Sequence, residues 1–191
     1  MRGLDLRSCL GLDPVDRKYY ASGDVLYSGD IHNANPPATL FATLDTRAGG
    51  STPAESTPLG DFDDTTDEYL DFLVRLPANY AGGGLTFGIE ISMTSATTAE
   101  VVFLAAIRRI VRDAEDLDAS HTYDYNSSGA ITVASAAGET VNVAITFTDG
   151  ADMDSWAAGE WAIVRIRRFA SDAGDDATGD CEMVGFSISE T

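Results

Sequence analysis

The stretch LTFGIEISMT, residues 85–94, decides the fold class, because apolar and small or polar side chains alternate along it. The apolar positions are Leu85, Phe87, Ile89, Ile91 and Met93. A period of two places all five on one side of an extended chain and leaves the other side to water. The stretch therefore predicts a β-strand with one buried face.

The same alternation recurs along the chain, in residues 70–76 (LDFLVRL), 141–147 (VNVAITF) and 182–188 (EMVGFSI). Residues 161–169 (WAIVRIRRF) also indicate a strand. Residues 100–112 (EVVFLAAIRRIVR) favour a long strand whose parity changes at a bulge near Arg108-Arg109, with a helix as the competing interpretation.

Strands with a single apolar face must pack in pairs of sheets, so the pattern predicts an all-β fold, an antiparallel β-sandwich. Periodicity alone leaves a jelly roll, an immunoglobulin-like sandwich and a small barrel open. Residues 1–35 lack a sustained period, which predicts an extended N-terminal arm with one short strand near residues 24–28. Pro36-Pro37 breaks the chain, and residues 36–191 are expected to form the sandwich domain.

Two segments at the start of this domain carry weaker signals. Residues 39–44 are a candidate strand. Residues 47–60 contain Gly49-Gly50, Pro53 and Pro58, which are typical of a long surface loop.

Charge and cysteine usage exclude several classes of partner. The 31 acidic residues exceed the 12 basic ones, for a net charge of −19. Such a field repels nucleic acids and anionic membranes, so neither is expected as a partner. Cys9 and Cys181 are too far apart in sequence to indicate a disulfide framework or a zinc motif. The N-terminus lacks the apolar stretch of a secretory signal, which favours a soluble protein made in a cytoplasm.

The sequence shows no pattern that indicates catalysis. His32 and His121 lie among polar, turn-forming residues and are interpreted as surface side chains. Nucleophile-elbow, phosphate-loop, dinucleotide-binding and zinc-protease motifs do not occur, so no enzymatic activity and no cofactor are expected. The acidic loops at residues 61–68 and 172–180 leave calcium binding as a minor alternative, although neither has EF-hand spacing.

Arginines gather on two candidate strands. Arg108, Arg109 and Arg112 lie on the first, and Arg165, Arg167 and Arg168 lie on the second. If the strands are neighbours, these side chains share a sheet face with carboxylates such as Glu90. They then form either an inter-subunit contact or a solvated face with weak ion pairs.

Residues 62–95 and 156–188 together resemble a jelly-roll protein that recurs in tailed bacteriophages. The shared features are an Asp-rich lead-in, a strand ending in Leu-Pro, a Tyr-x-Gly-Gly turn, an alternating strand, an arginine-ended strand, an acidic loop and a terminal apolar strand. The resemblance implies a jelly-roll fold, a virion location, a homotrimer and no cofactor. Its motifs specify the fold better than the role.

The leading functional hypothesis is a capsid decoration or cement protein that binds and stabilises the shell of the major capsid protein. The arm would then contact the shell through basic and apolar residues, namely Arg2, Leu4, Leu6, Arg7, Leu10, Arg17 and Tyr19. The alternative is a glycan- or receptor-binding domain of a tail fibre or baseplate. Its candidate stacking residues are Trp156, Trp161, Tyr123 and Tyr125, with Trp161 expected in the core because it begins a strand.

Overall fold

The computed structural model describes residues 23–191, which form an all-β structure with two short 3-10 helices. In that part of the chain no helix is long and apolar enough to cross a membrane. The elements are β1 (Val25–Asp30), η2 (Ile31–Asn33), β2 (Ala34–Asn35), β3 (Thr43–Ala48), β4 (Ser56–Phe62), β5 (Glu68–Arg75), β6 (Leu85–Met93), β7 (Glu100–Ile110), β8 (Tyr125–Thr132), β9 (Thr140–Phe147), η3 (Ala151–Met153), β10 (Trp161–Arg168) and β11 (Cys181–Glu190).

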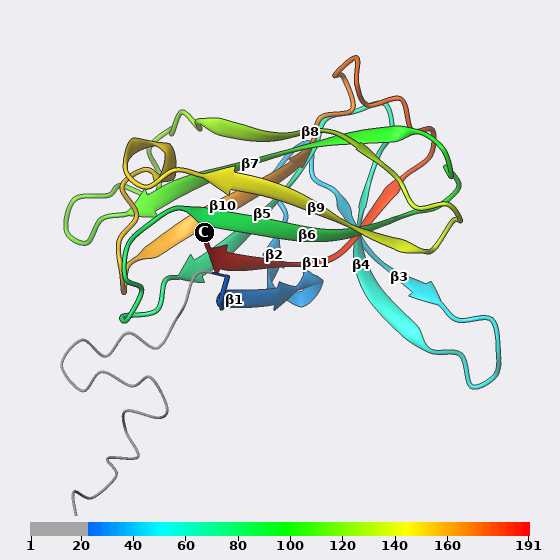
Figure 1. The fold of residues 1–191 in the computed structure, drawn as a ribbon, viewed down its shortest axis with the longest axis horizontal. Coiled ribbons are helices and arrows are strands. Elements are labelled where there is room, and N and C mark those ends of the chain that lie inside the picture. The colour runs from blue at the N-terminus through cyan, green and yellow to red at the C-terminus, as the bar shows by residue number, and fades with distance from the viewer. Residues whose placement is uncertain (1–22) are drawn as a thin grey trace, which may run out of the picture.

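The strands form two antiparallel sheets that pack face to face as a β-sandwich of jelly-roll type. Sheet A has the order β3-β4-β11-β6-β9, and β1 also pairs with β11. Sheet B has the order β2-β5-β10-β7-β8. Figure 1 shows the sheets as two stacked layers, with the β3–β4 hairpin projecting beyond the stack. The predicted antiparallel sandwich is confirmed.

The core lies between the sheets and is built by the alternation seen in the sequence. The apolar residues of β6 point inward, and Leu85, Phe87, Ile89 and Ile91 are fully buried. Aromatic rings join the layers: Phe72 of β5 lies 4.6 Å, between ring centroids, from Phe186 of β11. Burying each such ring stabilises the fold by about 2–3 kcal/mol.

Residues 25–35, which the sequence assigns to the arm, lie in the sandwich. The short strand expected near residues 24–28 is present as β1, which pairs with β11 in sheet A. β2 pairs with β5 in sheet B. Leu26 and Ile31 are buried in the core, which explains why this segment packs against the domain. The arm residues named as capsid contacts lie outside the described residues.

The segment at residues 47–60 is not the predicted loop. Residues 56–62 form β4, which pairs with β3 from Thr43↔Asp61 to Ala48↔Ser56. β3 also begins four residues after the start of the strand predicted at residues 39–44. Pro58 is tolerated because this end of β4 pairs on one side only, in the described structure.

Residues 100–110 form the strand β7 rather than a helix. The strand pairs with β10 without interruption from Phe103 to Ile110, so the bulge predicted near Arg108-Arg109 is absent there. The register shifts instead between Val102 and Leu104, where β7 meets β8. Residues 101–108 are all buried because β7 is covered on both faces, and this hides the alternation that marks the other strands.

A buried ion pair ties sheet B to the loop before β11. The Arg168 side chain is fully buried and points inward, and its Nη2 lies 2.9 Å from Oδ1 of Asp175. The same guanidinium donates hydrogen bonds to the carbonyl oxygens of Phe62, Ala177 and Gly179. Because these partners compensate the buried charge of Arg168, the ion pair holds the loop before β11 against sheet B.

Candidate binding face

The outer face of sheet B, here called the sheet-B face, carries the predicted arginines. β7 and β10 are neighbours, as the arginine hypothesis required. Residues opposite each other in an antiparallel pair share a face, so Arg108, which pairs with Ile163, lies on the same face as Arg165 and Arg167. Arg109 lies on the other face, opposite Ala162, and Arg112 is exposed beyond the end of β7.

The arginines of this face are held by carboxylates other than the predicted Glu90. Arg165 donates from Nε and Nη2 to the two oxygens of Asp71, at 2.6 and 2.7 Å. This bidentate bonding raises the pKa of the Arg165 guanidinium above its usual value. Arg167 forms an ion pair with Asp67. Glu90 lies on the opposite side of the molecule, in sheet A, because β6 is not in sheet B.

Aromatic rings cover these arginines. The guanidinium carbon of Arg165 lies 4.3 Å from the ring centroid of Tyr123 and 5.6 Å from that of Tyr69. Arg167 lies 5.4 Å from Tyr69 and 5.9 Å from Tyr125. Cation–π contacts of this kind orient both partners. The three rings Tyr69, Tyr123 and Tyr125 are partly exposed, and they are called the tyrosine platform below.

The tyrosine platform combines apolar ring surface with hydroxyl groups. The centroids of Tyr123 and Tyr125 are 5.9 Å apart, and His121 packs edge-on against Tyr123 at 5.0 Å. Burial raises the pKa of both tyrosines above the usual value, so their hydroxyls stay protonated at neutral pH and can donate hydrogen bonds. A surface of fixed rings and donors suits a ligand with both apolar and hydroxyl-bearing faces.

An apolar groove of about 430 Å³ adjoins the platform on the same face. Asp71, which holds Arg165, also lines the groove and so connects the two regions. Its other lining residues are mostly apolar, namely Asn35, Pro36, Pro37, Phe72, Leu73, Ile110, Leu117 and Ile163. We call this the aliphatic groove.

The structure reverses the positions expected of the two tryptophans. Trp161 is 45% exposed on the sheet-B face, with the Arg75 guanidinium 6.0 Å from its ring centroid, whereas the sequence placed it in the core. Trp156 is buried, and its Nε1 donates to the carbonyl oxygen of Glu160. The inward positions of β10 begin at Ala162, so Trp161, the first residue of the strand, points outward.

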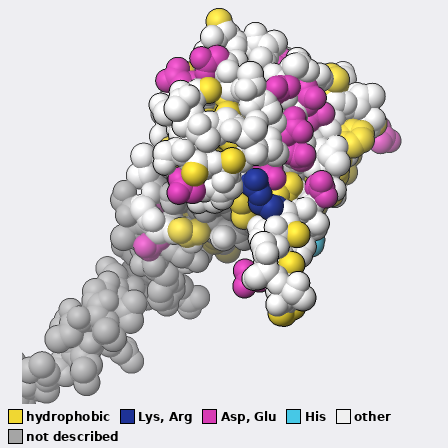
Figure 2. Space-filling view, turned by 90° about the vertical axis from the view of Figure 1, so that its right-hand side faces the viewer, with side chains coloured by type: hydrophobic (Ala, Val, Ile, Leu, Met, Phe, Trp, Pro, Cys, Tyr) yellow, Lys and Arg dark blue, Asp and Glu magenta, His cyan; other side chains and the backbone are white. Residues whose placement is uncertain are grey.

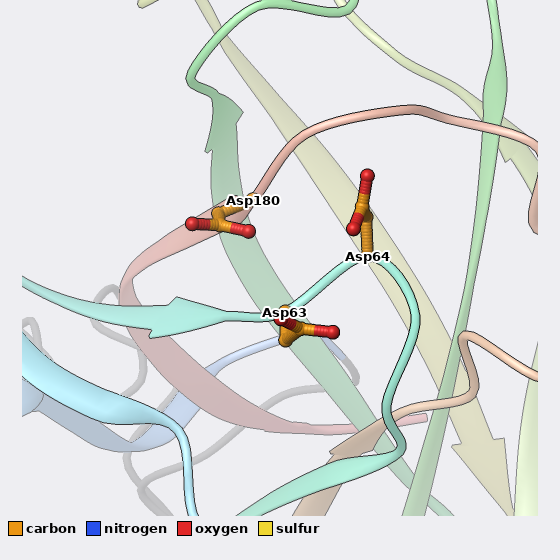
Figure 3. A group of neighbouring side chains, drawn as sticks. All are labelled: Asp63, Asp64 and Asp180. Carbon is orange, nitrogen blue, oxygen red and sulfur yellow. The ribbon is translucent and has the colours of Figure 1, made fainter.

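A second cluster lies at the end of the sandwich from which the hairpin projects. Asp63, Asp64 and Asp180 each offer a carboxylate oxygen, and these atoms lie within 4.8 Å of one another. Figure 3 shows two of the side chains on the loop after β4 and the third on the segment leading into β11. Figure 2 shows acidic side chains spread over this end of the molecule and basic ones in one small patch.

The chemistry of this carboxylate cluster is that of hard-cation ligands, but its members already have local partners. Asp63 accepts hydrogen bonds from the hydroxyl and the backbone amide of Thr65 and from the amide of Thr66, which lower its pKa. Asp64 accepts from the amide of Gly179. The neighbouring Asp61 has one buried oxygen without a partner, and burial raises its pKa to about 6. Within the cluster, burial and the charges of Asp63 and Asp64 raise the pKa of Asp180, so the carboxylates repel one another.

The sequence reasoning missed Tyr69, Asp71, Leu73 and Leu117. The first three had a usable signal, because they occupy the outward positions that alternate with Leu70, Phe72 and Val74. An aromatic, a carboxylate and a leucine facing outward on one strand are unusual for a solvated face. Leu117 had no such signal, since it lies in an irregular loop.

Comparison with known proteins gives a limited result. No family model matches the chain, and no curated protein sequence matches it. Among solved structures, the chain is similar to the CBM22-1 xylan-binding domain of Xyn10C from Paenibacillus barcinonensis, with 12% identity and a TM-score of 0.47 over 89% of this chain and 96% of that one.

Two further solved structures are also similar to the chain. One is a xylan-binding domain from CBM 22, with 13% identity and a TM-score of 0.47 over 90% of this chain and 97% of that one. The other is TmCBM61 in complex with β-1,4-galactotriose, with 13% identity and a TM-score of 0.37 over 81% and 90%. Likenesses of this size carry no functional argument, so the function is argued from the binding face itself.

Proposed function

We propose that the chain is a non-catalytic, glycan-binding β-sandwich domain whose ligand lies on the tyrosine platform. The observation that carries the proposal is the fixed arrangement of Tyr69, Tyr123 and Tyr125 over Arg165 and Arg167. Sugar rings present apolar C–H faces for stacking and hydroxyl edges for hydrogen bonds. Both kinds of partner are present on this face.

The charges of the face favour a neutral glycan. Arg165 and Arg167 are each paired with an aspartate, so they offer oriented N–H groups without a net positive patch. The overall charge of −19 repels polyanionic chains. A single-stranded nucleic acid also stacks on aromatic rings, but it needs a positively charged groove in addition.

The proposal is tested by a glycan array with the intact protein, followed by titration of the best ligand against variants. Tyr123→Ala and Tyr125→Ala should each weaken binding about tenfold, which corresponds to ~1.4 kcal/mol. Tyr123→Phe keeps the ring and should retain most of the affinity. Asn142→Ala, on the outer face of sheet A, serves as the control and should bind like the unmodified protein. Equal binding by all four variants would sink the proposal.

The second candidate function is the virion role, in which the domain contacts a capsid shell as a homotrimer. A specific observation favours a protein contact: the projecting β3–β4 hairpin and the chain before it expose three large apolar side chains, Leu40, Phe41 and Leu44, at 54%, 44% and 47%. Large apolar side chains exposed in this way are typical of protein interfaces. Light scattering should then give three times the monomer mass of 20.2 kDa, and Leu44→Asp should reduce it; a monomer at all concentrations contradicts the trimer.

A further inference from the structure

The aliphatic groove leaves large apolar side chains exposed to solvent. Leu73 is 50% exposed and Leu117 is 61% exposed, and Ile163 lies between them on the central strand β10. The tyrosine platform beside it has polar groups for a sugar, whereas the groove is lined mainly by aliphatic side chains and prolines. Its chemistry suits leucine-like side chains of a peptide.

The rim of the groove is acidic, and its position is fixed. Leu117 stands between Asp116 and Asp118, which are both exposed. Arg108 holds this loop from below: it donates from Nε and Nη2 to Glu115 and from Nη2 to the carbonyl oxygen of Asp116. A peptide that fits this groove therefore has apolar residues flanked by basic ones.

The N-terminal segment of the chain has this composition. Residues 2–7 read Arg-Gly-Leu-Asp-Leu-Arg, with Leu4 and Leu6 between Arg2 and Arg7. Residues 1–22 hold four basic and three acidic side chains, a net charge of +1, so the rest of the chain carries −20. The attraction between the two parts of the chain favours their contact.

The segment is also long enough to reach the groove of its own molecule. Gly23 is fixed to β11 by a hydrogen bond from its amide to the carbonyl oxygen of Glu190. The 17 residues from Leu6 to Gly23 span up to about 56 Å, whereas the longest strand, β7, is about 36 Å long. Tethering of this kind gives an effective concentration in the millimolar range, which favours contact within one molecule over contact between molecules.

We propose that residues 2–7 bind in the aliphatic groove of the same chain, with Leu4 and Leu6 against Leu117 and Ile163 and with the two arginines facing the acidic rim. This proposal does not rest on the glycan proposal, because no tyrosine of the platform lines the groove. Docking of residues 2–7 would cover the exposed leucines without covering the platform.

The native Cys9 makes this proposal testable by disulfide trapping in the full chain. Ala119 is exposed on the rim loop, so Ala119→Cys places a thiol beside the groove and leaves Leu117 intact. Ala144→Cys, exposed on β9 at the outer face of sheet A, is the matched control. Cys181 is fully buried, so it does not compete.

After mild oxidation of dilute protein, peptide mapping should find a Cys9 disulfide to the introduced cysteine within one chain in Ala119→Cys, and at least tenfold less in Ala144→Cys. Adding Leu4→Asp and Leu6→Asp should slow trapping at least tenfold. High salt screens the attraction between the arginines and the acidic rim, so it should also slow trapping, by a smaller factor. Disulfides between chains would assign the groove to a second copy. That result, the absence of trapping, or equal trapping in the two cysteine variants would overturn the proposal.

Discussion

The two outer faces of the sandwich are built on the same backbone pattern but carry different side chains. The outer face of sheet A presents small and polar residues such as Thr86, Gly88 and Glu90 on β6 and Asn142 on β9. The sheet-B face presents tyrosines, arginines and leucines. Both inner faces follow the same apolar rule, so the inner pattern determines the fold and the outer pattern determines where binding is expected.

The shallow hollow on the sheet A face makes the contrast sharper. It has a volume of about 250 Å³, and glycines of three adjacent strands, Gly29, Gly88 and Gly185, form much of its lining. A side chain at Gly185 would meet the carbonyl oxygen of Gly29 at 2.7 Å, so close strand packing accounts for that glycine. The sheet-B face instead fixes large side chains by ion pairs, which is the arrangement that prepares a surface for a ligand.

The largest expected effect separates the inner and outer arginines of β10. Arg168→Ala leaves Asp175 buried without a counter-charge and should reduce the free energy of unfolding by about 3–5 kcal/mol. Urea denaturation measures this loss. A loss below about 1 kcal/mol would show that the Arg168–Asp175 pair does not stabilise the fold as the structure indicates.

A smaller effect on stability but a larger one on binding is expected at Arg165. Its pair with Asp71 is partly exposed, so Arg165→Ala should reduce the free energy of unfolding by about 1 kcal/mol. Because Arg165 supports Tyr69 and Tyr123, glycan affinity should fall about tenfold. Arg165→Lys keeps the charge but loses the bidentate contact. Its glycan affinity, measured by titration, should lie between those of the unmodified protein and Arg165→Ala.

The pH dependence of stability tests Asp61, which lies on β4 next to the carboxylate cluster. Burial and the charges of Asp180 and Glu182 raise the pKa of Asp61 to about 6 in the folded chain, above its value in the unfolded chain. The folded state then binds the proton more tightly, so this group destabilises the fold above pH 6 and ceases to do so as the pH falls towards 4. The melting temperature should therefore rise between pH 7.5 and pH 5.

Asp61→Asn isolates this contribution. It should raise the melting temperature at pH 7.5 and make the dependence on pH flatter. Asp113→Asn, on the exposed loop after β7, is the control and should leave the profile unchanged. A profile that is the same for Asp61→Asn and the unmodified protein would assign the pH dependence to other groups.

The sequence could predict the sandwich because its strands β5, β6, β9 and β11 each keep one face dry. It could not predict the β3–β4 hairpin, because Gly49, Gly50 and Pro53 mark a turn without showing that strands continue on both sides. Nor could it reveal which strands are neighbours. For that reason the arginine cluster was predicted and its partner Asp71 was not.

The orientation of single aromatic residues was the other limit of the sequence reasoning. Trp161 begins a strand, and a shift of one residue decides whether such a side chain points inward or outward. Tyr123 lies just before β8 and Tyr125 begins it. Both are candidate stacking residues from the sequence, and both lie partly exposed against the arginines of the sheet-B face.

The position of β11 has a consequence for how the chain folds. The strand pairs with β1, β4 and β6, and its partners in β1 come as much as 164 positions earlier, as in the pair Val25↔Ser189. Sheet A is therefore completed only when residues 181–190 pair. Until then β1 has no partner strand among the described residues, and β4 is paired with β3 alone. Long-range pairing of this kind slows folding, so an intermediate in which sheet B forms first should accumulate during refolding.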